Sequence, residues 1–286
     1  MYPEDLRSTV DAALERLRFS SDAATAGLEE AMRYSLLAGG KRVRPVLTLA
    51  TARALGADPE GFLSVACAIE LIHTYSLIHD DLPAMDDDEL RRGVPTAHVK
   101  FGEDVAILAG DGLFAEAIRL FCGQPSPPSN VLAALGLLSA ATGVDGMVGG
   151  QYVDVAGEAT DSRGLRNLHE LKTGRLIAAS VEVVLALEGL EEPETIPYQR
   201  FAGELGVLFQ IVDDILDVTG TEEQLGKPRG SDERHGKLTY VSLFGLERAR
   251  ELAVESHANA AKALAEASGD TGDLKRVADY IFTRNE

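Results

Sequence analysis

The chain has 286 residues, a formal net charge of −19 and a hydrophobic fraction of 45 %. That length is enough for one large domain or two ordinary ones, and the apolar fraction is enough for a substantial core. The strong negative charge argues against nucleic acid and against an anionic membrane surface as partners.

The N-terminal stretch, Met1 to Arg18, mixes acidic and basic residues and lacks the apolar segment of a secretory signal. The most apolar run, residues 131–144, is too short to span a bilayer and contains glycines. The two cysteines, Cys67 and Cys122, both have apolar neighbours, which predicts buried, reduced thiols. We therefore expect a cytoplasmic protein without a transmembrane segment.

Apolar residues recur at helical spacing along almost the whole chain. Near the N-terminus they form two stripes, Leu6, Val10, Ala13, Leu14, Leu17 and then Leu28, Met32, Leu36. Longer helices are predicted over residues 61–81, 104–121, 130–142, 165–187, 195–218 and 237–266. Glycine- and proline-containing segments separate them, and no run of alternating β-branched residues indicates a sheet. The pattern predicts one all-α domain over residues 1–286.

The predicted helix 61–81 ends in a dense group of aspartates, which begins at Asp80 and Asp81 and continues from Asp86 to Asp88. On an ideal helix Asp80 and Asp86 would lie roughly 240° apart, on different faces. Pro83 stands between them, and a proline distortion could bring Asp86 back beside Asp80. The alternative is a helix that ends at Asp80 and Asp81, followed by an acidic loop.

A second group, Asp213, Asp214 and Asp217, lies within the predicted helix 195–218. Asp213 and Asp217 are four residues apart and share one helix face, together with Gln210. Aspartates at this spacing are usually solvated, but here apolar residues surround them. Carboxylates in such a setting are costly unless a cation neutralises them.

Divalent metal is the natural partner for these carboxylates, because the chain has no long basic block. Mg²⁺ prefers carboxylate oxygens and is commonly completed by water and substrate phosphates. Two separated aspartate groups joined by a diphosphate therefore suggest a metal-dependent enzyme that acts on a diphosphate ester.

The cations are distributed along the chain. Each alone is more often a surface residue, but arginine and lysine are also the usual phosphate ligands. Their order relative to the aspartates suggests two phosphate sites, one through metal and one through cations alone. The candidates are Lys41, Arg42, Arg44, Arg91, Arg92, Lys172, Arg175, Lys227 and Lys237.

At these residues the sequence resembles the trans-isoprenyl diphosphate synthases, the polyprenyl synthetase family. The likeness runs from Tyr34 to the C-terminal tail, Tyr280 to Asn285, and no motif is broken. Besides the first aspartate group with Arg91-Arg92-Gly93, the motifs are Gly39-Gly40-Lys41-Arg42-x-Arg44-Pro45, Gly150-Gln151-x-x-Asp154, Lys172-Thr173-Gly174, Gln210-x-x-Asp213-Asp214-x-x-Asp217 and Gly226-Lys227-Pro228-x-Gly230-x-Asp232.

The resemblance implies a bundle of antiparallel helices around a deep central cavity, in a homodimer, with the acidic motifs facing each other across its mouth. It implies three Mg²⁺ ions, two held by Asp80 and Asp86 and the third by Asp213. The residues that it implies for catalysis are Asp80, Asp81, Asp86, Asp213, Asp214, Asp217, Lys172 and Arg91.

The same resemblance implies two small-molecule substrates. Isopentenyl diphosphate would bind without metal to Lys41, Arg44, His73 and Arg92. An allylic diphosphate would contact Arg91, Lys172, Thr173, Gln210, Lys227 and Lys237.

The implied reaction is a head-to-tail (1'-4) condensation. The allylic diphosphate ionises because cations stabilise the leaving pyrophosphate and an apolar cavity shields the allyl cation from water. No strong base is evident in the sequence, so pyrophosphate is the expected proton acceptor. For His73 a phosphate contact or a structural role is favoured over general base, and for His79 a supporting hydrogen bond.

Tyr75 lies five residues before Asp80, about 7 Å away along a helix. In the family, an aromatic residue there together with the Pro83-Ala84 insertion is similar to bacterial farnesyl diphosphate synthases. This favours a fifteen-carbon product, with a geranylgeranyl diphosphate synthase as the alternative. The other interpretation of Tyr75 is a core residue whose hydroxyl bonds elsewhere. Less favoured functions are a class I terpene cyclase and a non-catalytic partner subunit.

Overall fold

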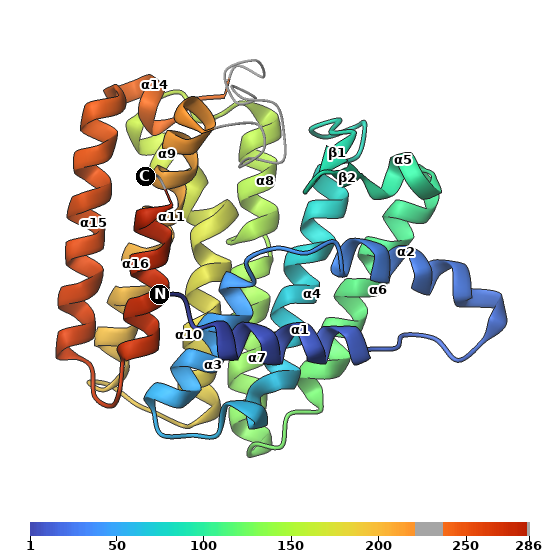
Figure 1. The fold of residues 1–286 in the computed structure, drawn as a ribbon, viewed down its shortest axis with the longest axis horizontal. Coiled ribbons are helices and arrows are strands. Elements are labelled where there is room, and N and C mark those ends of the chain that lie inside the picture. Colours follow the sequence, from blue (N-terminus) through green and yellow to red (C-terminus); the bar gives the residue numbers. More distant parts are fainter. Residues whose placement is uncertain (221–236, 285–286) are drawn as a thin grey trace.

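The computed structural model describes residues 1–220 and 237–284. It is an all-α bundle in which long helices run side by side, as the sequence predicts (Figure 1). The helices are α1 (Glu4–Arg16), α2 (Ala26–Leu36), α3 (Val43–Ala54), α4 (Leu63–Asp80), α5 (Ala97–Phe101), α6 (Glu103–Cys122), α7 (Pro128–Thr142), α8 (Met147–Ala156), α9 (Ser162–His169), α10 (Arg175–Leu187), α11 (Thr195–Thr219), α14 (Tyr240–Phe244), α15 (Leu246–Glu266) and α16 (Gly272–Thr283).

The central helix is α4, which packs against α1, α2, α3, α6 and α10. Neighbours on so many sides explain why its residues from Val65 to Ile72 are all buried. A helix that is apolar all round is stable only in such an interior position. The carboxyl end of α4 and that of α11 both lie at the upper end of the bundle in Figure 1.

Three predicted helices, 104–121, 130–142 and 195–218, correspond closely to α6, α7 and α11. The prediction over 237–266 was wrong in one respect, because Gly245 (φ 81°) separates α14 from α15. The predicted helix 165–187 is also divided, by a π-helical turn over Glu170–Gly174 between α9 and α10. The helices α3, α8 and α16 were not among the predicted ranges.

A short hairpin follows α4, which the sequence did not predict. Its strands β1 (Leu90–Arg91) and β2 (Val94–Pro95) are antiparallel, with Arg91 opposite Val94. The hairpin lies at the same end of the bundle as the ends of α4 and α11 (Figure 1). It thereby brings Arg91 and Arg92 close to the first aspartate group.

The expectation for the cysteines was half right. Cys67 is buried, and burial raises the pKa of its thiol to about 12. Cys122 is exposed, because it is the last residue of α6, at the surface. Both thiols are free.

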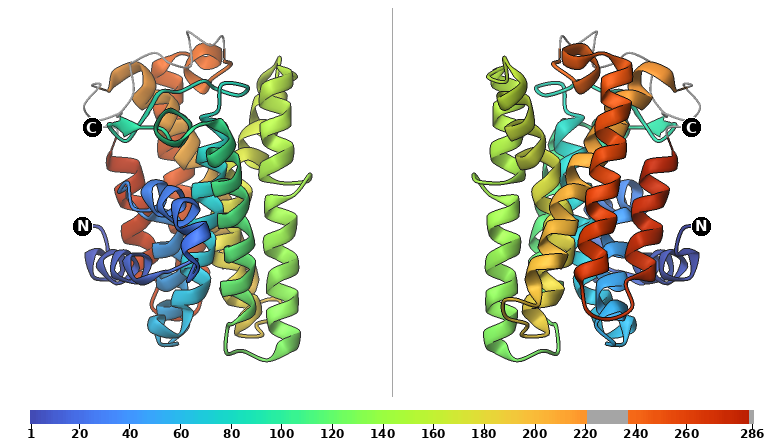
Figure 2. Two further views of the ribbon diagram at one scale, coloured as in Figure 1. Left: turned by 90° about the vertical axis from the view of Figure 1, so that its right-hand side faces the viewer. Right: turned by 90° about the vertical axis from the view of Figure 1, so that its left-hand side faces the viewer.

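Two helical stretches are long and apolar enough to cross a membrane, Pro59–Asp80 and Pro128–Ala156. The first contains α4, which belongs to the interior of the bundle. The second runs through α7 and α8, beyond the 131–144 run seen in the sequence, and only 33 % of its apolar window is buried. The helices α7 and α8 form a column along one side of the bundle (Figure 2).

Candidate active site

A cavity of about 630 Å³ opens between α4, α8 and α11. Asp80 reaches it from α4 and Asp213 from α11, so the two aspartate groups face one common space. Nine residues predicted for the site line this cavity: Arg44, His73, Tyr75, Asp80, Arg91, Arg92, Lys172, Thr173 and Asp213.

The first aspartate group combines the two alternatives that the sequence left open. The helix α4 does end at Asp80, and a tight turn follows in which the Met85 amide donates to the Leu82 carbonyl at 2.8 Å. The Asp86 amide then donates to the carbonyl of Asp80 at 2.9 Å. The chain thus returns on itself and brings Asp86 back to Asp80 without continuing the helix.

Asp80 is a desolvated carboxylate. Its pKa is raised to about 6: burial is the largest cause, Asp86 and Asp81 act in the same direction, and Lys172 and Arg91 act in the opposite direction. A raised pKa means that the charged form is disfavoured in its present surroundings. A further cation beside Asp80 would favour its ionised form.

Asp81 points away from this cavity and holds an arginine. Arg91 donates to both of its carboxylate oxygens, with Nε–O distances of 2.7 and 2.8 Å. Such a two-point pair fixes the plane of the guanidinium group. Asp81 therefore orients Arg91, which lines the cavity.

The second aspartate group divides its tasks. Asp213 lines the cavity, whereas Asp214 is buried and accepts from Gln210 Nε2 at 2.9 Å and from the Tyr240 amide at 2.7 Å. Gln210 Oε1 in turn accepts from the Thr173 hydroxyl at 3.3 Å. Asp214 thus ties α11 to α14 and, through Gln210, to the π-helical turn that carries Lys172 and Thr173.

Side-chain cations contact the two predicted metal ligands outside α4. Lys237 Nζ lies 3.1 Å from Asp86 Oδ1, and Arg284 Nη2 lies 2.5 Å from Asp213 Oδ1. Lys237 also contacts Asp154, 3.4 Å away, whose Oδ2 lies 2.5 Å from Lys172 Nζ. The carboxylates are thus balanced by the protein's own cations. Lys227 lies outside the described residues.

The donor set suits Mg²⁺. Asp80, Asp86 and Asp213 offer hard oxygen ligands, and cations already occupy positions beside the last two. Among residues 1–220 and 237–284, no three His, Cys, Asp or Glu side chains form one metal cluster. Mg²⁺ commonly takes one or two carboxylates and completes its shell with phosphate and water.

A second group of cations, Arg44 and Arg92, also lines the cavity. Arg44 is buried, and burial lowers its pKa to about 10, so it stays charged at neutral pH. His73 Nε2 lies 3.4 Å from Arg44 Nη1. Burial and the neighbouring arginines hold the pKa of His73 well below its usual value, so this histidine is neutral. Lys41 is exposed at the edge of this group and is not part of the cavity wall.

The wall of the cavity along α4 carries an aromatic cluster. The Tyr75 ring meets the His79 ring at 5.6 Å and the Phe114 ring of α6 at 5.3 Å, both edge to face. The His79 Nε2 atom lies 3.1 Å from the Ile107 carbonyl oxygen. Burial raises the pKa of the Tyr75 hydroxyl to about 12, so it remains neutral. Tyr75 and His79 both line the cavity beside Asp80.

Some cavity residues were not predicted. The α8 residues Met147, Val148, Gln151, Tyr152 and Val155 form much of the apolar wall, and Phe209 adds to it from α11. Gln151 belongs to a recognised motif, which was the available signal. The signal in the sequence for the contact between Arg284 and Asp213 was weaker, because only the likeness of the C-terminal tail to the family pointed to it.

Comparisons with known proteins assign the chain to a family. The chain is 46 % identical over 265 residues to the farnesyl diphosphate synthase of Geobacillus stearothermophilus, covering 91 % of this chain and 89 % of that one. It is also 46 % identical over 264 residues to the chloroplastic geranylgeranyl pyrophosphate synthase of Capsicum annuum, covering 90 % and 72 %. Among solved structures, the geranyltransferase of Helicobacter pylori complexed with magnesium and isoprenyl diphosphate is similar, with a TM-score of 0.87, 33 % identity and coverage of 98 % and 95 %. Residues 25–281 match the profile named polyprenyl synthetase, and the chain belongs to that family.

Proposed function

We propose that this protein is a Mg²⁺-dependent prenyltransferase that condenses isopentenyl diphosphate with dimethylallyl and geranyl diphosphate to give farnesyl diphosphate. One observation carries the proposal: Asp80 and Asp213 line one cavity together with Arg44 and Arg92. An acidic side and a cationic side in one cavity provide separate places for two diphosphates.

The allylic diphosphate occupies the acidic side. Asp80 and Asp86 would hold two Mg²⁺ ions and Asp213 a third, with Asp217 in support; bound Mg²⁺ would supply positive charge to neutralise the leaving pyrophosphate. Arg91, oriented by Asp81, and Lys172 donate to the same oxygens. When the diphosphate and metal bind, Lys237 leaves Asp86 for a phosphate oxygen. Lys227 is assigned to this substrate on the family resemblance alone.

The reaction then depends on charge and on exclusion of water. Thr173 and Gln210, which are hydrogen-bonded to each other, present fixed dipoles next to the allyl carbon as positive charge develops there. The apolar residues of α8 keep water from the cation. The alkene of isopentenyl diphosphate attacks, and the departing pyrophosphate accepts the proton that is lost.

Isopentenyl diphosphate occupies the cationic side, held by Lys41, Arg44 and Arg92. His73 accepts a hydrogen bond from Arg44 and so orients it. The strongly lowered pKa of His73 makes this residue a poor proton acceptor, which supports a positioning role over a general base.

Tyr75 sets the length of the product. Its ring is fixed by His79 and Phe114, so a growing chain meets aromatic groups a short way below Asp80. A geranylgeranyl diphosphate synthase is the second candidate, favoured by the relative of equal identity from Capsicum annuum. The aromatic cluster at Tyr75 favours the shorter product.

The direct test offers dimethylallyl, geranyl and farnesyl diphosphate separately, each with labelled isopentenyl diphosphate and Mg²⁺. We expect the first two to give a fifteen-carbon product and the third to give almost none. Efficient use of farnesyl diphosphate would establish the geranylgeranyl alternative. A cyclised hydrocarbon without consumption of isopentenyl diphosphate would establish a terpene cyclase, and no turnover with any primer would favour a partner subunit.

The proposed assembly is a homodimer of one-domain chains. Support for one domain comes from the hydrophobic core, which is continuous from Tyr2 to Ile281. Support for the dimer comes from large apolar side chains exposed on the α6–α8 side, since a surface of this kind usually marks an interface. They are Ile107, Leu108, Phe114, Leu132, Leu137, Val148, Tyr152 and Val155.

Two measurements test the assembly. Light scattering after gel filtration should give twice the chain mass, and replacing Leu132 and Leu137 by serine should shift it toward the monomer. Flotation with liposomes distinguishes the homodimer from a membrane-bound alternative. In the latter case, the same α6–α8 face would bind the vesicles and the protein would float with them. The proposed location is the cytoplasm, supported by the free thiols of Cys67 and Cys122.

A further inference from the structure

Arg42 stands between the two residues proposed to bind isopentenyl diphosphate, Lys41 and Arg44, yet it does not line the cavity. It is only 4 % exposed, and its backbone is left-handed, with φ 52° and ψ 36°. A residue with a side chain rarely adopts that conformation unless its surroundings impose it. Its carbonyl accepts from the Val46 amide at 3.0 Å and so begins α3.

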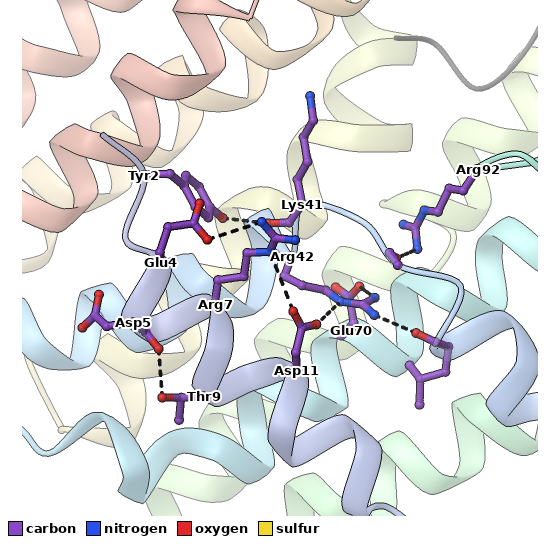
Figure 3. Close-up of polar contacts among 12 residues, drawn as sticks. Tyr2, Glu4, Asp5, Arg7, Thr9, Asp11, Lys41, Arg42, Glu70 and Arg92 are labelled. Atoms are coloured by element: carbon purple, nitrogen blue, oxygen red, sulfur yellow. Dashed lines mark hydrogen bonds and ion pairs between the residues drawn. The ribbon is translucent and has the colours of Figure 1, made fainter. Parts of the chain in front are cut away.

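The guanidinium group of Arg42 is fully engaged within the protein (Figure 3). Nη1 donates to Glu70 Oε1 of α4 at 2.7 Å, Nε to Asp11 Oδ1 of α1 at 2.9 Å, and Nη2 to the carbonyl of Leu36 in α2 at 2.9 Å. The side chains of Arg42 and Glu70 are each 2 % exposed. Arg42 is therefore anchored to three helices and cannot reach a substrate.

The residues on either side of Arg42 are fixed as well. The Tyr2 hydroxyl donates to the carbonyl of Lys41 at 2.9 Å, and Arg92 donates to the carbonyl of Gly39. A Cβ atom at Gly40 would lie 2.7 Å from Arg92 Cζ, so glycine is needed there for Arg92 to lie against the loop. Figure 3 shows the Lys41 side chain pointing away from the Arg42 network.

We infer that Arg42, anchored by Glu70 and Asp11, is a positioning residue that sets the places of Lys41 and Arg44 for isopentenyl diphosphate, and that Tyr2 assists it. The left-handed turn directs the Arg42 side chain into the protein, while Lys41 projects outward and Arg44 reaches the cavity. The anchor must hold this turn against its backbone strain, since free chains avoid it. The inference rests on the proposed function, in which Lys41 and Arg44 bind the second substrate.

The first test is Arg42→Lys, which keeps the charge but cannot bond Glu70, Asp11 and Leu36 together. We expect KM for isopentenyl diphosphate to rise by about tenfold or more, because small displacements of positioned groups weaken binding strongly. KM for geranyl diphosphate should stay within about twofold, since the acidic side is untouched. Tyr2→Phe, which removes one hydrogen bond, should give the same selective change at a smaller size.

Two control variants separate positioning from general loss of stability. Arg53→Lys alters an arginine on the same helix α3 that also bridges to α1, through Asp5, and to Asp273. Tyr198→Phe removes a hydroxyl-to-carbonyl bond, to Ser268, comparable to that of Tyr2. We expect both to lower the thermal midpoint without changing the ratio of the two KM values.

A readout independent of turnover is calorimetric titration with isopentenyl diphosphate in the presence of a chelator. Weaker binding by Arg42→Lys and Tyr2→Phe but not by the controls supports the inference. Equal rises of both KM values, or binding changes that follow the thermal midpoint in all four variants, would overturn it. Failure of the unaltered protein to consume isopentenyl diphosphate would instead overturn the proposed function, and absence of metal-free binding would overturn both.

Discussion

The two sides of the cavity are built in opposite ways. On the acidic side, the carboxylates of Asp86 and Asp213 are paired with the long side chains of Lys237 and Arg284. On the cationic side, Arg42 and Glu70 are buried, and the backbone at Lys41 is held by a hydrogen bond from the Tyr2 hydroxyl. In the proposed function, the first side would exchange its cations for metal, and the second would receive an anion without rearrangement. Substrate binding should therefore need metal on one side only.

The largest effect is expected from a substitution at Asp80, on the acidic side. Asp80→Ala should lower kcat by about a thousandfold or more, because the carboxylate acts through charge that stabilises the transition state. The circular dichroism spectrum should keep its helical signal. Metal-free binding of isopentenyl diphosphate should persist in this variant; its loss would mean that the two sides are not independent.

The matching change on the cationic side is Arg44→Met, which removes a buried charge and keeps the length of the side chain. We expect KM for isopentenyl diphosphate to rise by about a hundredfold, as for loss of a charge-assisted phosphate contact. The Mg²⁺ concentration for half-maximal rate should not change. A shifted metal requirement would contradict the separation of the two sides.

A change at Tyr75 leaves both proposed diphosphate sites intact and tests whether this residue limits the length of the product. Tyr75→Ala removes the ring between His79 and Phe114 and should shift much of the product from fifteen to twenty carbons. Chromatography of the dephosphorylated products measures the shift. Tyr75→Phe, which keeps the ring, should leave the product unchanged, and an unaltered product from the alanine variant would remove Tyr75 from this role.

The smallest expected effect concerns stability without metal. The folded-state pKa of Asp80, about 6, lies above its ordinary value of 3.8, so the folded protein binds this proton more tightly than the unfolded chain. The ionised carboxylate therefore costs stability as the pH rises from 3.8 toward 6 and throughout the range above. Asp80→Asn should raise the thermal midpoint at neutral pH in the presence of a chelator, and the gain should vanish below pH 3.8. A lower midpoint at neutral pH would show that Asp80 is stabilised by its surroundings.

Local patterns predicted much of the fold. The periodic helices α6, α7 and α11 appear close to the expected residues, because burial of an apolar stripe follows from the sequence itself. The division at Gly245 was missed, since nothing nearby indicated its positive φ. The exposure of Cys122 was also missed, because apolar neighbours in sequence do not say which face of a helix is covered.

The candidate site shows the same division. The pairing of Asp80 with Asp86 was left open because a turn, and not helix geometry, brings them together. The contacts of Arg284 with Asp213 and of Arg42 with Glu70 join residues 71 and 28 positions apart, respectively. Only the packing of the helices determines such pairs. Arg42 in particular looked like a third phosphate ligand in the sequence and is instead an internal anchor.

The position of Phe114 bears on how the proposed aromatic group limits the chain length of the product. This ring contacts Tyr75, which lines the cavity, yet Phe114 itself is 38 % exposed. In the proposed function, the aromatic group that limits chain length therefore has its outer edge at the protein surface. In the proposed homodimer, the second chain would cover this surface and hold the Phe114 ring in place. We therefore expect the distribution of product chain lengths to broaden on dilution, as the two chains separate.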